Sequence, residues 1–446
     1  MWYLIGLSAL MFDLAFFFPE QCGFLILFSF ISLGFVAVTM RRAWIGGFVW
    51  GVGIFAPHFS WLLLVMLRNS SAAWWLAAIV YLLVVGYFAV TSGCWLWLAS
   101  LCPVDLYENE VIPSKAGIQK NTRFPLGGGN DVKSQQSLVS IGWKRALWFI
   151  VTTLGYWCVV INWTVRPLGL DGYPFINPLL PLTVYRPFLK CVALVAMMAG
   201  RQCSMPRYDL NDVVYCPPVV NRVVNATASW RTDAHEVGKR IRDEFIALSA
   251  AHSQDGLYVT PESMYCFRLN YHPEIVALWG NALQPNDDLF IGSVIERAGR
   301  YYQAVFWLRK SLIINFYVKK LLTPFVEKMP DTLKTFEPLK QPFLSNTVEF
   351  CDGMRGFGAE FFDRGDHLRV IPRICLEFFF CSAHDFDAIR TTERDTWIFV
   401  FANDSWFDSH FRNILFLIAV LKANYSGLPV LYSGHFGCHR IIPQGA

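Results

Sequence analysis

The first hundred residues of the chain are almost free of charge, and this feature constrains the fold more than any other. Residues 1–102 carry only five of the 72 charged side chains in the 446-residue chain. Over the whole chain 54% of residues are apolar and 16% are charged, against about 25% charged in a typical soluble protein. Such a division excludes a disordered chain, a coiled coil and a soluble enzyme built throughout on one plan. We expect membrane helices first and a water-facing domain after them.

Five apolar stretches have about the 20 residues that a helix needs to cross a bilayer. A sixth stretch, Pro178–Gly200, is weaker because Arg186 and Lys190 would lie near mid-membrane, where charge is costly. The predicted division is about four spans in 1–102, a polar cytoplasmic loop in 103–143, further membrane or interfacial helices in 144–205, and a catalytic domain in 206–446. The five stretches are Met1–Phe18, Cys22–Met40, Trp44–Met66, Ala72–Leu101 and Ala146–Val165.

Basic residues suggest which side of the membrane each loop occupies. Arg41 and Arg42 follow the second stretch, and several lysines lie in the loop 103–143, on the same side. Positively charged loops stay in the cytoplasm, which places the N-terminus there as well. The C-terminal domain is then outside after five crossings and inside after six, and charge alone leaves both open.

Several function classes have no support in the sequence. A net charge of +4 is small for this length and gives no case for nucleic-acid binding. The twelve cysteines form no CxxC pair and no cluster with zinc spacing, so we expect no metal. The glycine run Gly127–Gly129 lacks the GK[ST] of a phosphate-binding loop, so we expect no nucleotide cofactor.

The half of the chain after Cys216 shows strands that alternate with helices, which is typical of an α/β layered domain. Two amphipathic or apolar segments predict helices, Asp233–His252 and Phe411–Ala423. Short apolar runs bounded by turn residues predict strands at Gly256–Thr260, Asp288–Ile295, Tyr301–Arg309, Arg373–Phe380 and Trp397–Ala402.

Three residues at or near predicted strand ends have the chemistry of acyl transfer through a thiol. Cys375 could attack a carbonyl, Glu262 could take and return the proton, and Lys319 could stabilise the oxyanion. Each also has an ordinary interpretation as a core cysteine, a solvated turn or a surface lysine. A Cys/His pair that uses His384 or His410 is an equally open alternative on spacing alone.

Seven segments in order resemble the nitrilase (carbon–nitrogen hydrolase) superfamily, and specifically the apolipoprotein N-acyltransferase family. VTPESM around Glu262 is similar to the family's Trp-Pro-Glu strand end, with Thr260 in place of the Trp, and FYVKKLLTPFVE is similar to its Y-x-K-x-x-L-V-P-F-G-E loop. The other segments are IGGFVWGVGIFAPHFSWLLLV, LFIGSVIERAGRYYQAVFWL, FFDRGDHLRVIPRICLEFFF and the pair FANDSWFDSH and GLPVLYSGHFGCHRIIPQG.

The resemblance implies a multi-span α-helical membrane bundle followed by an α/β nitrilase-like domain, an α-β-β-α sandwich. It implies a catalytic triad of Glu262, Lys319 and Cys375, with no cofactor and no metal. A phospholipid would donate the acyl chain, and the N-terminal diacylglyceryl-cysteine of a lipoprotein would accept it. The protein would be a monomer in the bacterial inner membrane, with its catalytic domain on the periplasmic side. Three further residues would support the triad: Glu327, Glu377 and Asn403.

The chain also departs from the family pattern. Val326 replaces a glycine, Leu376 a tyrosine and Tyr425 a glutamate, and the chain ends at Ala446, where the family continues into a last transmembrane helix. These departures leave two alternatives open. One is a catalytically degenerate relative that serves as a membrane component of a conjugation or secretion system. The other is a membrane-tethered amidase or nitrilase.

Overall fold

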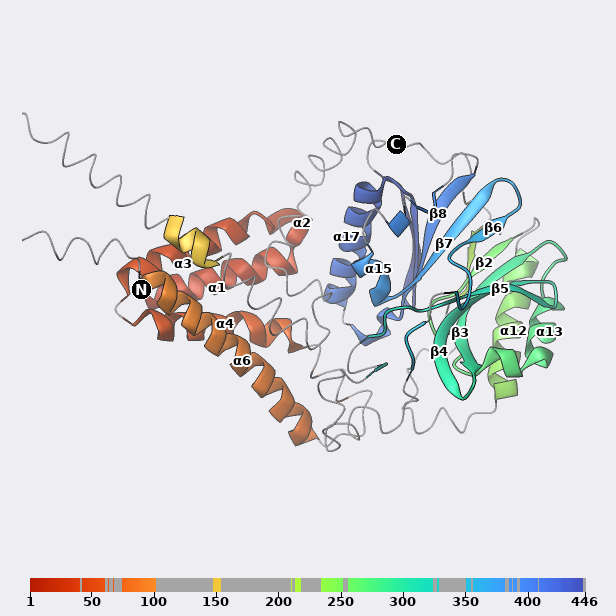
Figure 1. Cartoon of the computed structure of the whole chain (residues 1–446), viewed down its shortest axis with the longest axis horizontal. Coiled ribbons are helices and arrows are strands. Elements are labelled where there is room, and N and C mark those ends of the chain that lie inside the picture. Colours follow the sequence, from red (N-terminus) through yellow and green to blue (C-terminus); the bar gives the residue numbers. More distant parts are fainter. Residues whose placement is uncertain are drawn as a thin grey trace, which may run out of the picture.

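The computed structural model places a group of apolar helices beside an α/β domain, and the two parts meet along one face (Figure 1). The structure describes residues 1–40, 42–60, 63, 67, 74–101, 147–153, 210, 213–217, 234–251, 256–323, 327–328, 350–353, 356–381, 385–386, 388–390, 394–407 and 409–443. The expected loop 103–143 and the weak span Pro178–Gly200 lie outside these residues.

The N-terminal part consists of apolar helices packed on one another. Helix α1 lies against α3 and α4, and α4 lies against α6. The short helix α2 follows α1 directly. The bounds are α1 Trp2–Phe17, α2 Pro19–Cys22, α3 Leu25–Thr39, α4 Ala43–His58 and α6 Trp74–Ser100.

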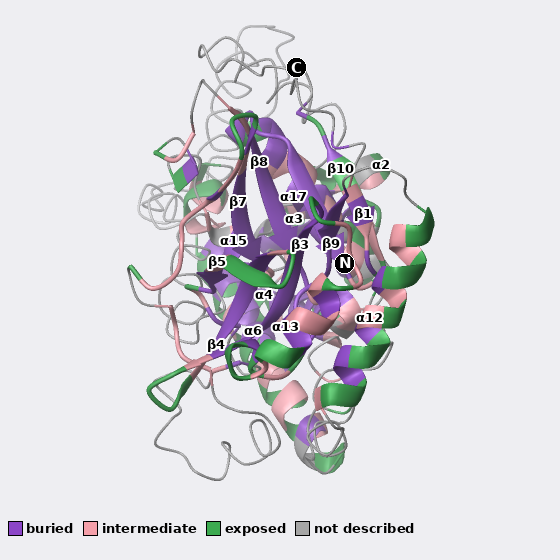
Figure 2. Cartoon of the chain, turned by 90° about the vertical axis from the view of Figure 1, so that its right-hand side faces the viewer, coloured by how far each residue is buried: buried purple, intermediate pink, exposed green. Residues whose placement is uncertain are grey.

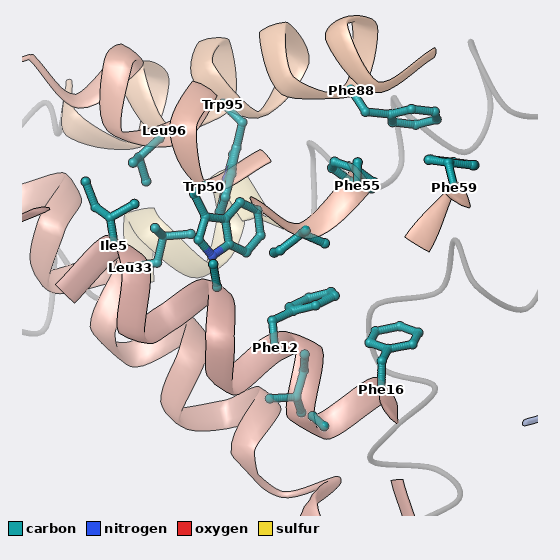
Figure 3. Close-up of a cluster of buried hydrophobic side chains, with 14 of the residues drawn as sticks. Ile5, Phe12, Phe16, Leu33, Trp50, Phe55, Phe59, Phe88, Trp95 and Leu96 are labelled. Carbon is teal, nitrogen blue, oxygen red and sulfur yellow. The ribbon is translucent and has the colours of Figure 1, made fainter. Parts of the chain in front are cut away.

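Aromatic side chains fill the space between these helices (Figure 3). The Trp50 ring lies edge-on to Phe12, at 5.6 Å between centroids, and 5.7 Å from the ring of Trp95. The Trp50 indole N–H donates to the Ser8 hydroxyl at 3.1 Å, which satisfies the one polar atom of this buried side chain. Ser8 and Ser29 each donate to the other's backbone carbonyl at 2.8 Å, so α1 and α3 are joined by polar contacts inside an apolar cluster.

Helices α4 and α6 approach so closely that there is no room for side chains at two α4 positions. A Cβ at Gly47 would lie 2.5 Å from the Ser92 carbonyl oxygen, and one at Gly51 would lie 2.8 Å from the Ala89 Cα. Small residues four apart that let two backbones meet are typical of helix pairs in membranes. The sequence therefore favours direct backbone contact over side-chain interdigitation at this pair.

Helices α1, α3 and α4 are shorter than the spans predicted from the sequence. Among the described residues, one helix is long and apolar enough to cross a membrane, the 77–100 part of α6. Helices α1, α3 and α4 have 16, 15 and 16 residues, fewer than the roughly 20 that a crossing takes. Helix α4 ends at His58, with Pro57 in its last turn, although the hydropathy pattern predicted a helix over Trp44–Met66. Of Ala146–Val165, residues 147–153 are described and are helical.

The C-terminal part contains two five-stranded mixed sheets. The first has the order β1-β2-β3-β4-β5, with β1, β2 and β3 parallel and the remaining pairs antiparallel. Its strands are β1 Val213–Tyr215, β2 Leu257–Val259, β3 Asp288–Arg297, β4 Arg300–Arg309 and β5 Leu312–Val318.

The second sheet has the order β10-β9-β8-β7-β6. Its three central strands β7, β8 and β9 are parallel, and the edge strands β6 and β10 pair antiparallel to them. The strands are β6 Phe362–Arg364, β7 Leu368–Ile374, β8 Asp395–Phe401, β9 Val430–Gly434 and β10 Gly437–Ile441.

The two sheets pack face to face and helices cover both outer faces, so the domain is an α-β-β-α sandwich (Figures 1 and 2). Apolar residues from both sheets, such as Phe290 and Phe399, form the central layer. Helices α12 (Ala234–Ala251) and α13 (Pro273–Gly280) cover the first sheet, and α15 (Leu376–Phe380) and α17 (Ser409–Ser426) cover the second.

A buried carboxylate joins elements of both sheets. Asp288 of β3, which is fully buried, accepts hydrogen bonds from Trp307 and Arg309 of β4 at 2.7 and 2.8 Å. Arg364 of β6, in the other sheet, donates to the second carboxylate oxygen at 2.6 Å. Several donors thus compensate the buried charge, which burial alone would disfavour.

In the α/β domain the predicted helices and strands agree with the structure within a few residues, except at the segment that carries Cys375. The expected strand Arg373–Phe380 is wrong: β7 ends at Ile374, and Leu376–Phe380 is the helix α15. Six of the eight residues in this segment are apolar, and such a short run does not distinguish a strand from a buried helix. Cys375 is therefore the link between a strand and a helix rather than a residue inside a strand.

The apolar helices meet the domain at α15 and α17. The hydrophobic cluster that contains Phe16 and Phe59 of the helical part also contains Leu376 of α15, Leu415 and Ile418 of α17. In Figure 1 the layer formed by α15 and α17 faces the helical part. The residue next to Cys375 is thus packed into the junction between the two parts of the molecule.

Candidate active site

Four of the residues singled out in the sequence follow the C-terminal ends of strands at one edge of the sandwich. Glu262 lies three residues after β2, Lys319 directly after β5, Cys375 directly after β7 and Asn403 two residues after β8. In sheets with parallel strands, side chains at this edge converge on a common space. The sequence could place these residues at strand ends, and the packing of the two sheets brings them together.

Lys319 lies at the centre of a buried ion cluster. Its ammonium group donates to the Glu262 carboxylate at 2.9 Å and to the Glu327 carboxylate at 2.8 Å. The side chain of Lys319 is fully buried, and both carboxylates are nearly so. Glu327 is held in turn by the backbone N–H of Thr323 at 2.6 Å. Two acidic side chains and one lysine leave the cluster with one net negative charge.

Cys375 occupies a sharp turn between β7 and α15. Its φ is 49° and its ψ is −121°, a conformation that non-glycine residues rarely adopt. Its backbone N–H donates to the Phe401 carbonyl at 2.7 Å, which fixes the turn against β8. A strained strand-to-helix turn presents a nucleophile at the edge of a sheet. The charge of Glu262 raises the pKa of the thiol, and the backbone N–H of Asn403 lowers it.

Asn403 contributes through its backbone. Its N–H donates to the second oxygen of the Glu262 carboxylate at 3.1 Å, while its side-chain oxygen accepts from the Ser405 hydroxyl at 2.6 Å. Both Glu262 oxygens are thus directed, one to Lys319 and one to Asn403, which limits the rotation of the carboxylate. The contact of Asn403 with Glu262 is therefore made by its backbone N–H and does not involve its side chain.

Glu377 holds the turn that carries Cys375. Its buried carboxylate accepts hydrogen bonds from the hydroxyl of Tyr317, from the backbone N–H of Lys320 at 3.2 Å and from that of Ile374 at 3.1 Å. It therefore ties the end of β7 to the end of β5, the two strands that carry Cys375 and Lys319. Its structural role is to position the turn.

Burial and charge set the protonation of the cluster. Burial raises the pKa of Glu262 to about 7 from an ordinary 4.5, against the opposing effect of Lys319 and with a further rise from Glu327. Burial lowers the pKa of Lys319, but Glu262 and Glu327 together raise it above its ordinary value, so the ammonium stays charged. Burial and the charge of Glu262 raise the pKa of the Cys375 thiol, although Lys319 lowers it.

These directions change one expectation. A nearby cation ordinarily lowers the pKa of a thiol, and Lys319 is the residue of the predicted triad that could do so. In the structure Lys319 is shared by two carboxylates, whose negative charge works against ionisation of the thiol. Cys375 is consequently a protonated thiol beside a carboxylate that titrates near neutrality. Activation then requires proton transfer from sulfur to Glu262.

Two residues that the sequence did not single out lie against the backbone of Glu262. A Cβ at Gly292 of β3 would lie 2.5 Å from the Pro261 carbonyl oxygen and 2.8 Å from the Glu262 Cα. The His435 Nε2 lies 3.1 Å from the Glu262 carbonyl oxygen, and its own backbone N–H donates to Asp404 at 2.6 Å. A glycine inside a buried strand is a sequence signal for such a close approach, whereas His435 carries none.

The structure describes only some of the remaining sequence candidates. His384 and Val326 lie outside the described residues, and His410 lies in α17. Tyr425 is half-exposed on the same helix. Among the residues that the structure describes, no three His, Cys, Asp or Glu side chains are grouped so as to hold a metal ion.

No family model matches the chain. Two curated proteins named apolipoprotein N-acyltransferase, from Brucella suis and Brucella melitensis, are each 24% identical to it over 245 residues. The match covers 50% of this chain and 44% of each relative, so the chain spans less than half the length of the curated relatives it matches.

Solved structures with low overall similarity include three chains. Two are glutamine-dependent NAD(+) synthetases, each with a TM-score of 0.32 and each aligned with 45% of this chain. The one from Cytophaga hutchinsonii is 13% identical and is covered over 33% of its own chain. The one from Acinetobacter baumannii is 12% identical and is covered over 35% of its own chain. The third is a CN-hydrolase superfamily protein from Xanthomonas campestris, with a TM-score of 0.31, 14% identity, and coverage of 46% and 74%.

The class that fold and site define is an α/β domain of two mixed sheets with a strand-end Glu, Lys and Cys. The curated relatives make this more specific. They confirm the resemblance seen in the sequence: the chain is similar to apolipoprotein N-acyltransferases and fits a divergent member of that family.

Proposed function

We propose that the protein is a membrane acyltransferase that moves a fatty acyl chain from a phospholipid, through a thioester on Cys375, to the N-terminal amine of a lipoprotein. The observation that carries the proposal is the buried Glu262–Lys319–Glu327 cluster beside a thiol in a strand-to-helix turn. The curated relatives support an acyltransferase-type role at low identity.

In the first step the Cys375 sulfur attacks the ester carbonyl of the phospholipid while its proton moves to Glu262. The carbonyl oxygen gains the negative charge, and the Lys319 ammonium is the nearby cation that would stabilise it. The intermediate collapses, the ester C–O bond breaks, and the departing lysophospholipid oxygen takes the proton from Glu262. The products are a thioester on Cys375 and a lysophospholipid.

In the second step the amine of the acceptor attacks the thioester carbonyl. Glu262 takes a proton from the amine nitrogen, and the C–S bond breaks as the thiol regains a proton from Glu262. The acyl chain is then bound as an amide. A pKa near 7 suits Glu262 to both directions of transfer, because neither protonation state is strongly disfavoured at neutral pH.

The helical part gives this chemistry access to lipids. We propose that the apolar helices form a multi-span bundle in the bacterial inner membrane, with the nitrilase-like domain on the periplasmic side. Their outward faces carry large apolar side chains, and the junction around Leu376 joins the bundle to the turn of Cys375. Exposed members of the outward faces are Trp2, Ile31, Phe35, Leu82, Leu83 and Val90.

Mass spectrometry of the purified protein after incubation with phosphatidylethanolamine vesicles tests the proposal. We expect a mass increase of one acyl chain on wild-type protein, removed by hydroxylamine and lost in Cys375→Ala. Cys266→Ala is the matched control, because Cys266 is an exposed cysteine on the same domain. A wild-type protein that never gains the acyl chain would contradict the proposal and favour a catalytically inactive membrane component.

Release of free fatty acid separates a transferase from a hydrolase. If the thioester forms and water discharges it as fast as a diacylglyceryl-cysteine peptide does, the membrane-tethered hydrolase is the better description. The acyltransferase predicts that the peptide amine discharges the thioester much faster than water does.

A further inference from the structure

His435 directly follows β9, at the same edge of the second sheet as two residues of the candidate site. Cys375 directly follows β7 and Asn403 lies two residues after β8, and β7, β8 and β9 are neighbouring parallel strands. The carboxyl ends of parallel strands meet at one edge of a sheet, where their side chains share a common space. The end of β9 therefore belongs to the candidate site, as the ends of β7 and β8 do.

The ring of His435 holds the backbone of Glu262, which comes from the other sheet. The His435 Nε2 lies 3.1 Å from the Glu262 carbonyl oxygen. A carbonyl oxygen can only accept a hydrogen bond, so Nε2 carries a proton and donates it. Because Glu262 follows β2 of the first sheet, this hydrogen bond joins the strand ends of two different sheets.

Bonds between the sheets matter for the chemistry because the base and the nucleophile come from different sheets. Two groups of the second sheet hold Glu262: the Asn403 N–H donates to its carboxylate at 3.1 Å, and His435 donates to its backbone carbonyl. Lys319 comes from the same sheet as Glu262, so their ion pair does not set the offset between the sheets. Glu262 is thus tied at its backbone and at its carboxylate to the sheet that carries Cys375.

The peptide bond that His435 holds leads into an unusual backbone conformation. Ser263, the residue after Glu262, has a φ of 57°, which residues other than glycine seldom adopt. Such a conformation persists only where the surrounding structure fixes it. Gly292 packs against this peptide bond as well, since a Cβ at Gly292 would lie 2.8 Å from the Ser263 nitrogen. The direction in which Glu262 leaves the backbone therefore depends on contacts such as that with His435.

His435 is itself firmly held. Its backbone N–H donates to the Asp404 carboxylate at 2.6 Å, and a Cβ at the preceding Gly434 would overlap that same carboxylate. The Gly434 carbonyl accepts a hydrogen bond from the Tyr215 hydroxyl at 2.6 Å. Tyr215 belongs to β1 of the first sheet, so a second bond between the sheets holds the same turn. A side chain on a turn fixed in this way can set the position of its partner.

We propose that His435 is a positioning residue, whose Nε2–H holds the backbone of Glu262 so that the Glu262 carboxylate faces the Cys375 thiol. The inference rests on the proposed function and adds a residue to it. His435 exchanges no proton with the substrate in this role: the thiol proton moves to Glu262 and from there to the departing oxygen. A reacting group displaced by about 1 Å can slow a reaction by about 100-fold, so loss of this bond should be visible in the rate.

Two substitutions separate the hydrogen bond from the rest of the side chain. His435→Leu removes the donor, whereas His435→Gln restores one, because the glutamine amide nitrogen is as many bonds from Cβ as the histidine Nε2. Acylation of Cys375 is measured by mass with phosphatidylethanolamine vesicles and with p-nitrophenyl acetate, which needs no lipid site. We expect His435→Leu to lower the maximal rate by about 10- to 100-fold with both donors. The vesicle concentration that gives half the maximal rate should stay the same, and His435→Gln should recover most of the rate.

His439→Leu is the matched control, because His439 is an exposed histidine on the neighbouring strand β10. Acylation of His435→Leu at the wild-type rate would overturn the inference, and so would a His435→Gln variant as slow as His435→Leu. A lower melting temperature with an unchanged rate per folded molecule would show a structural role and also overturn it. If p-nitrophenyl acetate acylates Cys375 but phospholipid does not, the proposed function fails and the ester rates still decide on His435. If neither donor acylates Cys375, both fail.

Discussion

At the scale of single residues, the site depends on how three charges share a buried space. One ammonium group compensates two carboxylates, so the group that is left to vary with pH is Glu262. This arrangement favours the protonated form of the Cys375 thiol. A resting thiol is less exposed to oxidation than a resting thiolate, since the thiolate is the reactive form.

The pH dependence of acylation follows from the same charges. Glu262 must be ionised to accept the thiol proton, and burial raises its pKa to about 7. Acyl-enzyme formation should therefore be slow below pH 7 and rise as the pH increases through that value. The measurement is the rate of the mass increase in phosphatidylethanolamine vesicles, taken across the pH range.

Glu327→Gln tests the electrostatic origin of that midpoint. The charge of Glu327 is one cause of the raised pKa of Glu262, so its removal should move the midpoint to lower pH. Glu360→Gln is the control, because Glu360 is an exposed carboxylate paired with Lys320 on the surface. An unchanged midpoint in Glu327→Gln, or one at higher pH, would contradict this account of the cluster.

At the scale of secondary-structure elements, the turn at Cys375 shows the limit of hydropathy patterns. The segment from Val370 to Phe380 is mostly apolar, and a strand ends and a helix begins inside it. The carboxylate of Glu377 accepts hydrogen bonds from backbone N–H groups at the ends of β5 and β7, and these bonds fix the boundary. Glu377 and Arg373 are the two charged side chains in the segment, and Glu377 is the local signal of a break.

The contact between helices α4 and α6 yields a prediction for the helical part. Gly51→Leu should destabilise the bundle by about 1–3 kcal/mol, the usual cost of overpacking, because its Cβ would lie 2.8 Å from the backbone of Ala89. Gly86→Leu is the matched control, since a Cβ at Gly86 meets no atom within 4 Å. Thermal unfolding in detergent micelles measures both, and equal effects of the two substitutions would show that α4 and α6 do not meet at Gly51.

At the scale of the whole molecule, two junctions set the shape. One is the packing of the two sheets, to which the buried Asp288 adds polar contacts from β3, β4 and β6. The other is the apolar junction of the helices with α15 and α17. The candidate site lies at the first junction, since Glu262 and Lys319 come from the first sheet and Cys375 from the second. It adjoins the second junction through Leu376, the residue after Cys375.

Asp288→Asn should weaken the first junction. The substitution leaves the guanidinium groups of Arg309 and Arg364 without their carboxylate, and breaking a buried ion cluster costs about 3–5 kcal/mol. We expect about 3 kcal/mol less free energy of unfolding, because Arg309 is partly exposed. Asp366→Asn is the control, as Asp366 is almost fully exposed. Equal thermal unfolding of the two variants would show that Asp288 does not clamp the sheets.

The sequence by itself determined the division into an apolar first part and an α/β second part, since charge density and the period of apolar residues are local quantities. It also placed Glu262 and Lys319 at strand ends, because a polar residue after a buried run marks an end. The tertiary structure decided what those residues meet: the two carboxylates on Lys319, the left-handed turn of Cys375, and the contacts of Gly292 and His435 with Glu262. These contacts join residues that are far apart in the chain. Their energies come from burial and charge where the two sheets meet, and a local sequence pattern contains no information about that meeting.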